Sequence, residues 1–320
     1  MRKLGLKLGL SCAALAACAT TLVSTTFAWY TSNESVKATG VTGSTSNEDT
    51  TLLLISKTGK VGSWGASVNY DFTSDKIVLA PVAYDATAKD YFTWDATNNA
   101  VSETAATAAT DGTTTGGAYL SFSMYFKSGS SDSLNVVSDA TITAVANTKE
   151  GSLPAKSVLA AGTGSSNDTY TIDMLRATNV VTTVGAAKEV ASTSTTNAAF
   201  TTETPTRTAY ELDSYAGADS YKDGDSNAHT YYNNVKSLTG TAAIDATKKT
   251  SEATLKKFGA DFVGQKIGET GAGAAANGGL DNCLRVDYVI YVDGWDVACF
   301  DAVRSQGITI TFGFKGTKAE

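Results

Sequence analysis

Apolar and polar residues alternate along two segments near the carboxyl end of the chain. In residues 284–292, every second position is apolar, at Leu284, Val286, Tyr288, Ile290 and Val292. The same period of two returns in residues 308–314, at Ile308, Ile310, Phe312 and Phe314. Because successive side chains of a β-strand point to opposite faces of the sheet, this pattern predicts two strands that close a half-buried sheet. The connection over residues 295–307 exceeds a tight hairpin, so the second strand is also able to pair elsewhere.

The strongest pattern in the first half of the chain lies in residues 118–127. Leu120, Phe122, Met124 and Phe126 alternate with Ser121, Ser123 and Tyr125. An antiparallel strand with one face in water requires this alternation. Shorter or weaker patterns predict strands at residues 52–55, 76–81, 91–94 and 170–181, the second of them stopped by Pro81.

Helical signals are few. Leu255, Phe258 and Phe262 recur at helical spacing within residues 250–264, and Pro154 would fit the first turn of a short helix over residues 152–162. Thr, Ala and Gly make up most of residues 102–117, and residues 191–250 are rich in Thr, Ser, Asn, Asp and Tyr; we interpret both stretches as loops. The pattern therefore predicts an all-β, mainly antiparallel fold with long loops and one or two short helices.

The amino terminus has the pattern of a secretory signal. A basic start over residues 1–7 precedes an apolar run that continues to Ala28. Cleavage after Ala28 would leave Trp29 as the first residue of a secreted chain. The residues that end in Cys18 spell a lipoprotein-type cleavage box, which offers lipidation as an alternative, and an uncleaved anchor of about 20 residues is a third interpretation.

The rest of the chain is long enough for one large β domain. We assign residues 1–28 to the signal, 29–50 to an amino-terminal segment and 51–320 to a single β-sandwich domain with loop insertions. Removing the signal takes away three basic residues and no acidic one, so the formal net charge changes from -7 to -10. Such an acidic chain disfavours nucleic acid and anionic lipid as partners, and leaves membrane contact to the signal or a lipid anchor.

Cysteine placement agrees with export. Cys12 and Cys18 lie inside the signal, which leaves Cys283 and Cys299 in the exported chain. In a secreted protein a disulfide between these two is the natural interpretation, and it would contribute about 3 kcal/mol by closing a short loop. Two separate thiols are the alternative.

Catalytic and cofactor motifs are lacking. The single histidine, His229, has no Gly-x-Ser-x-Gly turn to accompany it, and no phosphate-binding glycine motif follows a strand. We therefore expect neither an enzyme nor a cofactor. One metal-like string offers carboxylate and amide oxygens to Ca²⁺, at Asp219, Asp223, Asp225 and Asn227, although we favour a solvated Asp/Gly turn as its interpretation.

The segment that follows the signal is strand-like but has no local partner. Val36, Ala38 and Gly40 alternate with Lys37 and Thr39, and the apolar area is too small to hold a strand in place alone. This segment can form the first strand of its own sheet, trail from the domain, or add to the open sheet edge of another molecule.

The amino terminus resembles the TasA/camelysin family of exported proteins of Gram-positive bacteria. The resemblance rests on the Ala-rich apolar signal ending in Thr-Phe-Ala28, the aromatic pair Trp29-Tyr30, a short Thr-Ser-Asn-Glu turn and the segment 36–41. It implies a jelly-roll-like β-sandwich whose subunits assemble into extracellular fibres. In such fibres the amino-terminal segment of one copy would add as a strand to the next, with the following residues entering pockets: Trp29, Tyr30, Val36, Ala38 and Val41.

Two functions follow as expectations. The first is a secreted subunit of an extracellular filament or biofilm-matrix fibre, whose partner is a second copy of itself. The second is a monomeric, adhesin-like surface module, lipidated at Cys18, that binds a host or cell-surface ligand through its Thr- and Tyr-rich loops.

Overall fold

Two β-sheets packed face to face make up the fold. The computed structural model describes residues 37–46, 52–72, 79–95, 100–113, 116–145, 178–211, 255–272, 282–294 and 307–319. Within these ranges the chain is nearly all β, which confirms the predicted all-β sandwich. Four strand pairings are parallel and the others antiparallel, so the sheets are mixed.

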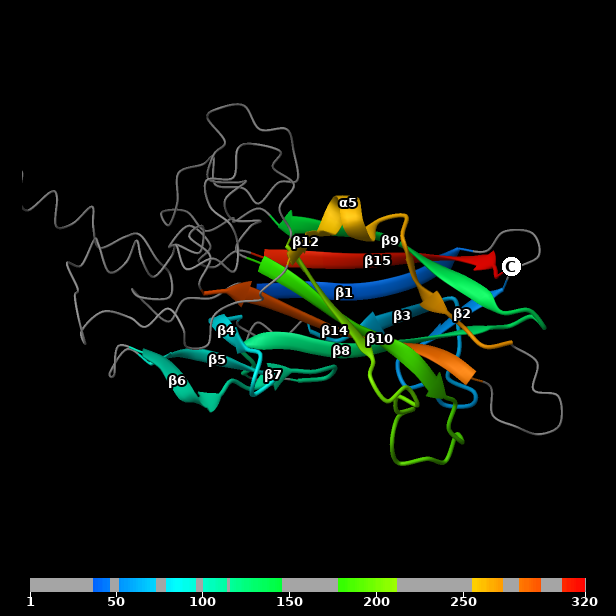
Figure 1. Cartoon of the computed structure of the whole chain (residues 1–320), viewed down its shortest axis with the longest axis horizontal. Coiled ribbons are helices and arrows are strands. Elements are labelled where there is room, and N and C mark those ends of the chain that lie inside the picture. The colour runs from blue at the N-terminus through cyan, green and yellow to red at the C-terminus, as the bar shows by residue number, and fades with distance from the viewer. Residues whose placement is uncertain are drawn as a thin grey trace, which may run out of the picture.

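The smaller sheet has five strands. Their order is β13 (Lys266–Glu269), β9 (Leu134–Val145), β15 (Gly307–Lys318), β1 (Lys37–Ser46) and β3 (Ser67–Tyr70). The long strands β9, β15 and β1 run side by side in Figure 1.

The larger sheet has ten strands and centres on β14 (Asn282–Asp293). On one side β14 pairs with β10 (Thr178–Lys188), followed by β11 (Thr206–Glu211) and β12 (Leu255–Lys257). On the other side it pairs with β8 (Tyr119–Ser128), which also holds β2 (Leu53–Ser56) and β7 (Ala108–Ala109). The end of β14 pairs with β4 (Pro81–Asp85), which is followed by β5 (Asp90–Asp95) and β6 (Ala100–Ala105).

Aromatic side chains fill the space between the sheets. Phe312 of β15 lies 4.7 Å from Tyr288 of β14 and 6.1 Å from Phe122 of β8, measured between ring centroids. Phe126 and Phe314 meet edge to face at 4.5 Å. The predicted inward residues of β14 and β8 all lie in this core, as the period of two requires.

One short helix closes the side of the sandwich. Helix α5 (Phe258–Phe262) places its two phenylalanines against Tyr210 of β11, and Phe262 also faces Phe312 of the other sheet. No helix in the described part of the chain has the length and apolar character needed to cross a membrane.

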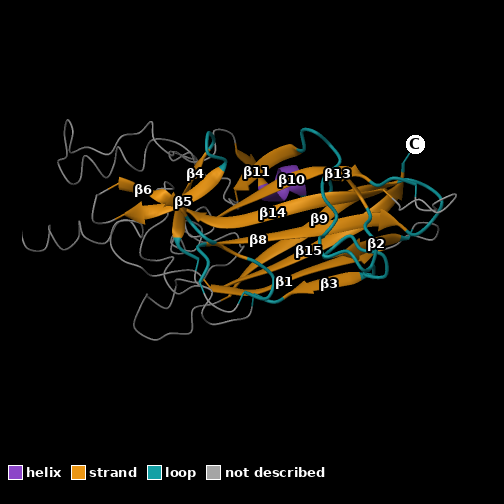
Figure 2. Ribbon diagram, turned by 90° about the horizontal axis from the view of Figure 1, so that it is seen from below, coloured by secondary structure: helices purple, strands orange, loops and turns teal. Residues whose placement is uncertain are grey.

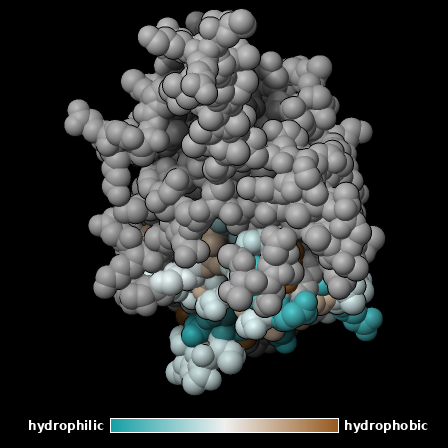
Figure 3. All heavy atoms as spheres, turned by 90° about the vertical axis from the view of Figure 1, so that its left-hand side faces the viewer, coloured by the Kyte–Doolittle hydropathy of each residue, from teal (hydrophilic) through white to brown (hydrophobic). Residues whose placement is uncertain are grey.

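Strands β4, β5 and β6 lie at one end of the molecule (Figures 1 and 2). Figure 3 faces that end, and its described atoms are mostly hydrophilic or intermediate, with hydrophobic atoms scattered among them.

Several element predictions were wrong in detail. The two carboxy-terminal strands do not pair with each other, because β14 and β15 belong to different sheets, which is the alternative that the long connection left open. Pro81 begins β4 instead of stopping a strand, and residues predicted as loop form β6, β7 and β11. Leu255–Lys257 extends the edge of β11 as β12, so the predicted helix is limited to α5. The predicted helix at residues 152–162 lies outside the described residues.

Candidate functional site

Strand β1 is the first element of the described chain, and it lies inside a sheet. On one side it runs parallel to β15, from Lys37 opposite Gly307 to Ser46 opposite Lys315. On the other side it runs antiparallel to β3, from Val41 opposite Tyr70 to Ser44 opposite Ser67. The remaining pairings described in this sheet are antiparallel, so the parallel contact sets β1 apart.

Main-chain hydrogen bonding holds β1 more than its side chains do. Its sequence consists mainly of Thr, Ser and Gly, and Val41 is its one fully buried apolar side chain among those described. Burial of one valine contributes about 2 kcal/mol, whereas the strand shares paired positions with two neighbours. The groove between β15 and β3 therefore accepts β1 chiefly as backbone.

The two halves of β1 differ in their neighbours. Residues 41–44 pair on both sides, and Thr45 donates its backbone N–H to the Ala66 carbonyl at 2.9 Å. Residues 37–40 pair with β15 only, and the register shifts there between Ala38 and Gly40. Within the described chain, the beginning of β1 thus has one unpaired edge.

The structure describes part of the predicted polymerisation strand. Ala38 lies opposite Ile308 of β15, and Val41 is buried in the core. Both therefore lie in the chain's own sheet, as in the alternative in which this segment forms its own first strand. Trp29, Tyr30 and Val36 lie outside the described residues.

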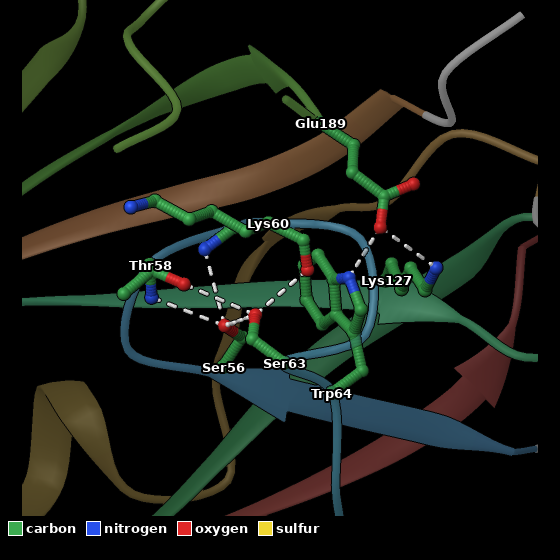
Figure 4. Close-up of polar contacts among 8 residues, drawn as sticks. Ser56, Thr58, Lys60, Ser63, Trp64, Lys127 and Glu189 are labelled. Atoms are coloured by element: carbon green, nitrogen blue, oxygen red, sulfur yellow. Dashed lines mark hydrogen bonds and ion pairs between the residues drawn. The ribbon is translucent and has the colours of Figure 1, made fainter. Parts of the chain in front are cut away.

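A second candidate is a polar cluster centred on Glu189, which follows β10 (Figure 4). Its carboxylate accepts a hydrogen bond from Trp64 Nε1 and lies 3.1 Å from Lys127 Nζ. The Lys127 ammonium also lies 4.9 Å from the Trp64 ring centroid. Glu189 is only 3% exposed, so its ion pair with Lys127 is largely buried. Together with the hydrogen bond from Trp64, this ion pair joins three segments that are distant in the sequence.

Trp64 belongs to the loop between β2 and β3, and several hydroxyl groups lie in or next to this loop (Figure 4). They bond to each other and to the backbone. Ser56 Oγ and Ser63 Oγ lie 2.6 Å apart, and Ser56 Oγ accepts the backbone N–H groups of Thr58 and Gly59. Ser63 donates to the Lys60 carbonyl at 2.7 Å. These bonds fold the loop between β2 and β3. Among the described residues, no histidine or carboxylate bonds to these hydroxyls to activate a nucleophile.

A groove of about 270 Å³ lies between β10–β11 and α5–β13. Thr182, Thr208 and Tyr210 contribute hydroxyl groups to its lining, and Lys256 and Lys266 contribute amines. Among the described residues, no acidic side chain lines the groove. Glu269 lies beside it and pairs with Lys266 at 3.0 Å. The groove suits a small polar or anionic ligand better than an apolar one.

The other predicted sites fall largely outside the described chain. Cys283 is buried beside Tyr125, Ala187 and Ala198, but Cys299 lies outside the described residues, so the disulfide stays a prediction. Also outside are Cys18, His229 and the candidate calcium ligands Asp219, Asp223, Asp225 and Asn227. Among the residues that are described, no three His, Cys, Asp or Glu side chains gather as a metal site.

Local sequence patterns do not reveal the Glu189 cluster. Its members are separated by 62 and 125 residues, and each alone is an ordinary charged or aromatic residue. Only the topology brings them together. In comparisons with known proteins, no family model, curated protein or solved structure matches the chain.

Proposed function

We propose that the protein is a secreted structural subunit that polymerises into an extracellular filament or biofilm-matrix fibre. In this proposal β1 leaves its own sheet and enters the equivalent groove of the next copy. The observation that carries the proposal is the position of β1, which is the first described strand and yet lies between β15 and β3.

Exchange of a terminal strand between copies conserves its contacts. The same parallel pairing with β15 and antiparallel pairing with β3 would form, now between two molecules. The empty groove would expose unpaired backbone and the core beneath it, which favours filling by a matching strand. When each copy gives its strand to one neighbour and accepts a strand from another, the contact is head-to-tail, and a filament grows if the rotation between copies does not close a ring.

The first experiment is electron microscopy of the purified exported chain, with and without Ca²⁺, after mass spectrometry of its amino terminus. We expect an amino terminus at Trp29 and regular fibres. A chain that stays monomeric under all these conditions would overturn the proposal.

A cross-link then tests the exchange itself. Thr42 and Thr311 lie opposite each other on β1 and β15, and both side chains are exposed, so a Thr42→Cys/Thr311→Cys variant can form a disulfide. Equal amounts of ¹⁴N and ¹⁵N protein are assembled under reducing conditions, oxidised and digested. Random exchange between copies gives about half of the linked peptides with mixed isotopes. Fibres without mixed peptides would keep the fibre function but exclude β1 exchange.

The groove between β10–β11 and α5–β13 favours a second function, an anchored surface module that binds a polar or anionic ligand. This function predicts an acylated Cys18 at the mature amino terminus and a monomeric protein. The same mass measurement and micrographs therefore distinguish the two proposals.

A further inference from the structure

We infer that Gly43 fixes the register of β1 in the groove between β15 and β3. Gly43 thereby selects β1 of a second copy of this chain as the strand that enters this groove. The selection between copies rests on the proposed fibre function. The register within one chain does not.

Gly43 lies where the strand comes closest to the core. A Cβ atom at this position would be 3.1 Å from Met124 Cε and 3.2 Å from both Ile55 Cδ1 and Val68 Cγ2. These atoms come from β8, β2 and β3, so the close contact involves three elements at once. Gly43 does not have a positive φ, so lack of space, and not backbone conformation, makes glycine suitable here.

The inward positions of β1 alternate in size. Val41 is completely buried, Gly43 follows two residues later, and Thr45 is the next inward residue. A slip by two residues would bring the side chain of Val41 or Thr45 to the place of Gly43, where even one carbon is crowded. A slip by one residue would turn the exposed face into the core.

The outward face of β1 does not distinguish between registers. Thr42, Ser44 and Ser46 are exposed and of similar size and polarity, so a two-residue slip exchanges like for like. The register therefore depends on the inward residues, and the incoming strand needs a small β-branched residue followed two positions later by glycine. A second copy of this chain brings that pair in Val41 and Gly43.

Synthetic peptides test the selection without changing the protein. Three peptides of residues 37–46 are added to assembling full-length exported chain: the natural peptide, Gly43→Val, and Thr42→Val as a control with the same added valine on the exposed face. We expect the natural and Thr42→Val peptides to slow fibre elongation. The Gly43→Val peptide should need about tenfold more for the same effect, because it overpacks the groove.

Each other outcome has a distinct meaning. Equal inhibition by all three peptides overturns the role of Gly43 and leaves the fibre function intact. Fibres that grow unchanged with every peptide exclude this groove as the acceptor of the incoming strand. Absence of fibres without peptide removes the proposed function, and the register within the single chain is then measured directly.

Paired cysteines measure that register in the intact chain. Thr42→Cys/Thr311→Cys reports the observed register, and Ser44→Cys/Thr311→Cys reports a slip by two residues. We expect the first pair to oxidise readily and the second poorly. Adding Gly43→Val should lower the yield of the first pair several-fold.

Restored space provides the control. Met124→Ala removes the nearest crowded atom, so in the Gly43→Val background it should recover part of the lost cross-link. If Gly43→Val prevents folding, the smaller change Gly43→Ala is used with the same rescue. A cross-link yield that Gly43→Val leaves unchanged would overturn the inference.

Discussion

The hydroxyl group of Tyr288 lies in the apolar layer between the two sheets. The side chain is completely buried, packs against Phe122 and Phe312, and has no hydrogen-bond partner for its hydroxyl among the described residues. A buried polar group without a partner lowers stability by about 1–3 kcal/mol. The ring therefore stabilises the core while its hydroxyl opposes folding.

We accordingly expect Tyr288→Phe to raise the free energy of unfolding at pH 7 by about 1 kcal/mol. Urea unfolding followed by fluorescence measures the change. Tyr70→Phe is the matched control, because the Tyr70 hydroxyl donates a hydrogen bond to the Ser123 carbonyl and its loss should destabilise. A Tyr288→Phe protein less stable than the natural chain would contradict this account.

The same tyrosine makes stability depend on alkaline pH. Burial raises the pKa of Tyr288 well above its usual value of about 10, and the nearby Tyr70 and Tyr210 raise it further. Below pH 10 both folded and unfolded states keep the proton. Above it only the unfolded state releases the proton, so stability falls as pH rises, by about 1.4 kcal/mol per pH unit for this group.

Unfolding measured between pH 9 and pH 11 tests this. Tyr288→Phe should make the fall of stability with rising pH shallower by the contribution of one tyrosine. Other buried tyrosines, such as Tyr70, should still contribute to that fall. Equal slopes for the two proteins would show that Tyr288 ionises as easily in the folded chain as in the unfolded one.

Glu189 and Lys127 form an ion pair away from water. Their side chains are 4% and 15% exposed, so Glu189→Gln removes a carboxylate charge that faces a mostly buried ammonium group. We expect this substitution to destabilise the protein by about 3 kcal/mol. Glu269→Gln breaks the Lys266 pair, whose side chains are 47% and 52% exposed, and should change stability by less than about 1 kcal/mol. Similar effects in a thermal unfolding assay would argue against a special role for the buried pair.

Among the larger elements, the loop between β2 and β3 is joined to the segment that follows β10. Val190 donates its backbone N–H to the Gly59 carbonyl at 3.1 Å, and Val61 donates to the Val190 carbonyl at 2.9 Å. Gly59 has a φ of 64°, and a Cβ there would lie 2.7 Å from Ala198 Cβ and 2.8 Å from Tyr125 Cδ1. Both its conformation and its surroundings exclude a side chain.

Gly62 of the same loop separates these two causes. It also has a positive φ, of 83°, but nothing lies within 4 Å of its Cβ position. We expect Gly62→Ala to cost about 1 kcal/mol from backbone strain, and Gly59→Ala to cost about 3 kcal/mol because overpacking is added. Equal values in urea unfolding would mean that the neighbouring loop yields without resistance.

The elements that could be predicted from sequence are those with a core on one face. In β14 and β8 the period of two is imposed by burial between the sheets, and it was visible in Leu284, Tyr288 and Met124. By contrast, β1 depends on β15, more than 250 residues away, and a strand of Thr, Ser and Gly does not specify that partner locally. The helical spacing of Leu255 and Phe258 was overridden because the edge of β11 was open to Leu255–Lys257.

The candidate site was also predictable only in part, because the sequence indicated the strand but not its contacts. Sequence indicated a weakly apolar strand near residue 38 that needs a partner, and Ala38 and Val41 do lie in a strand. It did not indicate that Gly43 faces Met124 and Ile55, because this contact joins three elements that only the fold brings together.

For the whole molecule, net charge opposes association between copies. The chain carries a formal net charge of -7, and loss of the basic signal would make it -10. Salt screens such repulsion, with a Debye length of about 10 Å at 0.1 M. If the chain forms fibres, we expect elongation followed by light scattering to be faster at 0.5 M than at 0.02 M sodium chloride. Growth that slows with salt would point instead to attraction between charged patches.

The parallel pairing of β1 and β15 also determines how the molecule bears mechanical load. Force applied outward at the start of β1 and the end of β15 pulls the two strands along each other, because both run in the same direction (Figure 1). All nine paired positions then resist together in shear, whereas a hairpin pulled at its open end would separate one bond at a time. Single-molecule pulling at the start of β1 and the end of β15 should therefore give a higher rupture force than pulling a hairpin at its open end. A pair of strands joined in this way suits a protein that carries tension between its two ends.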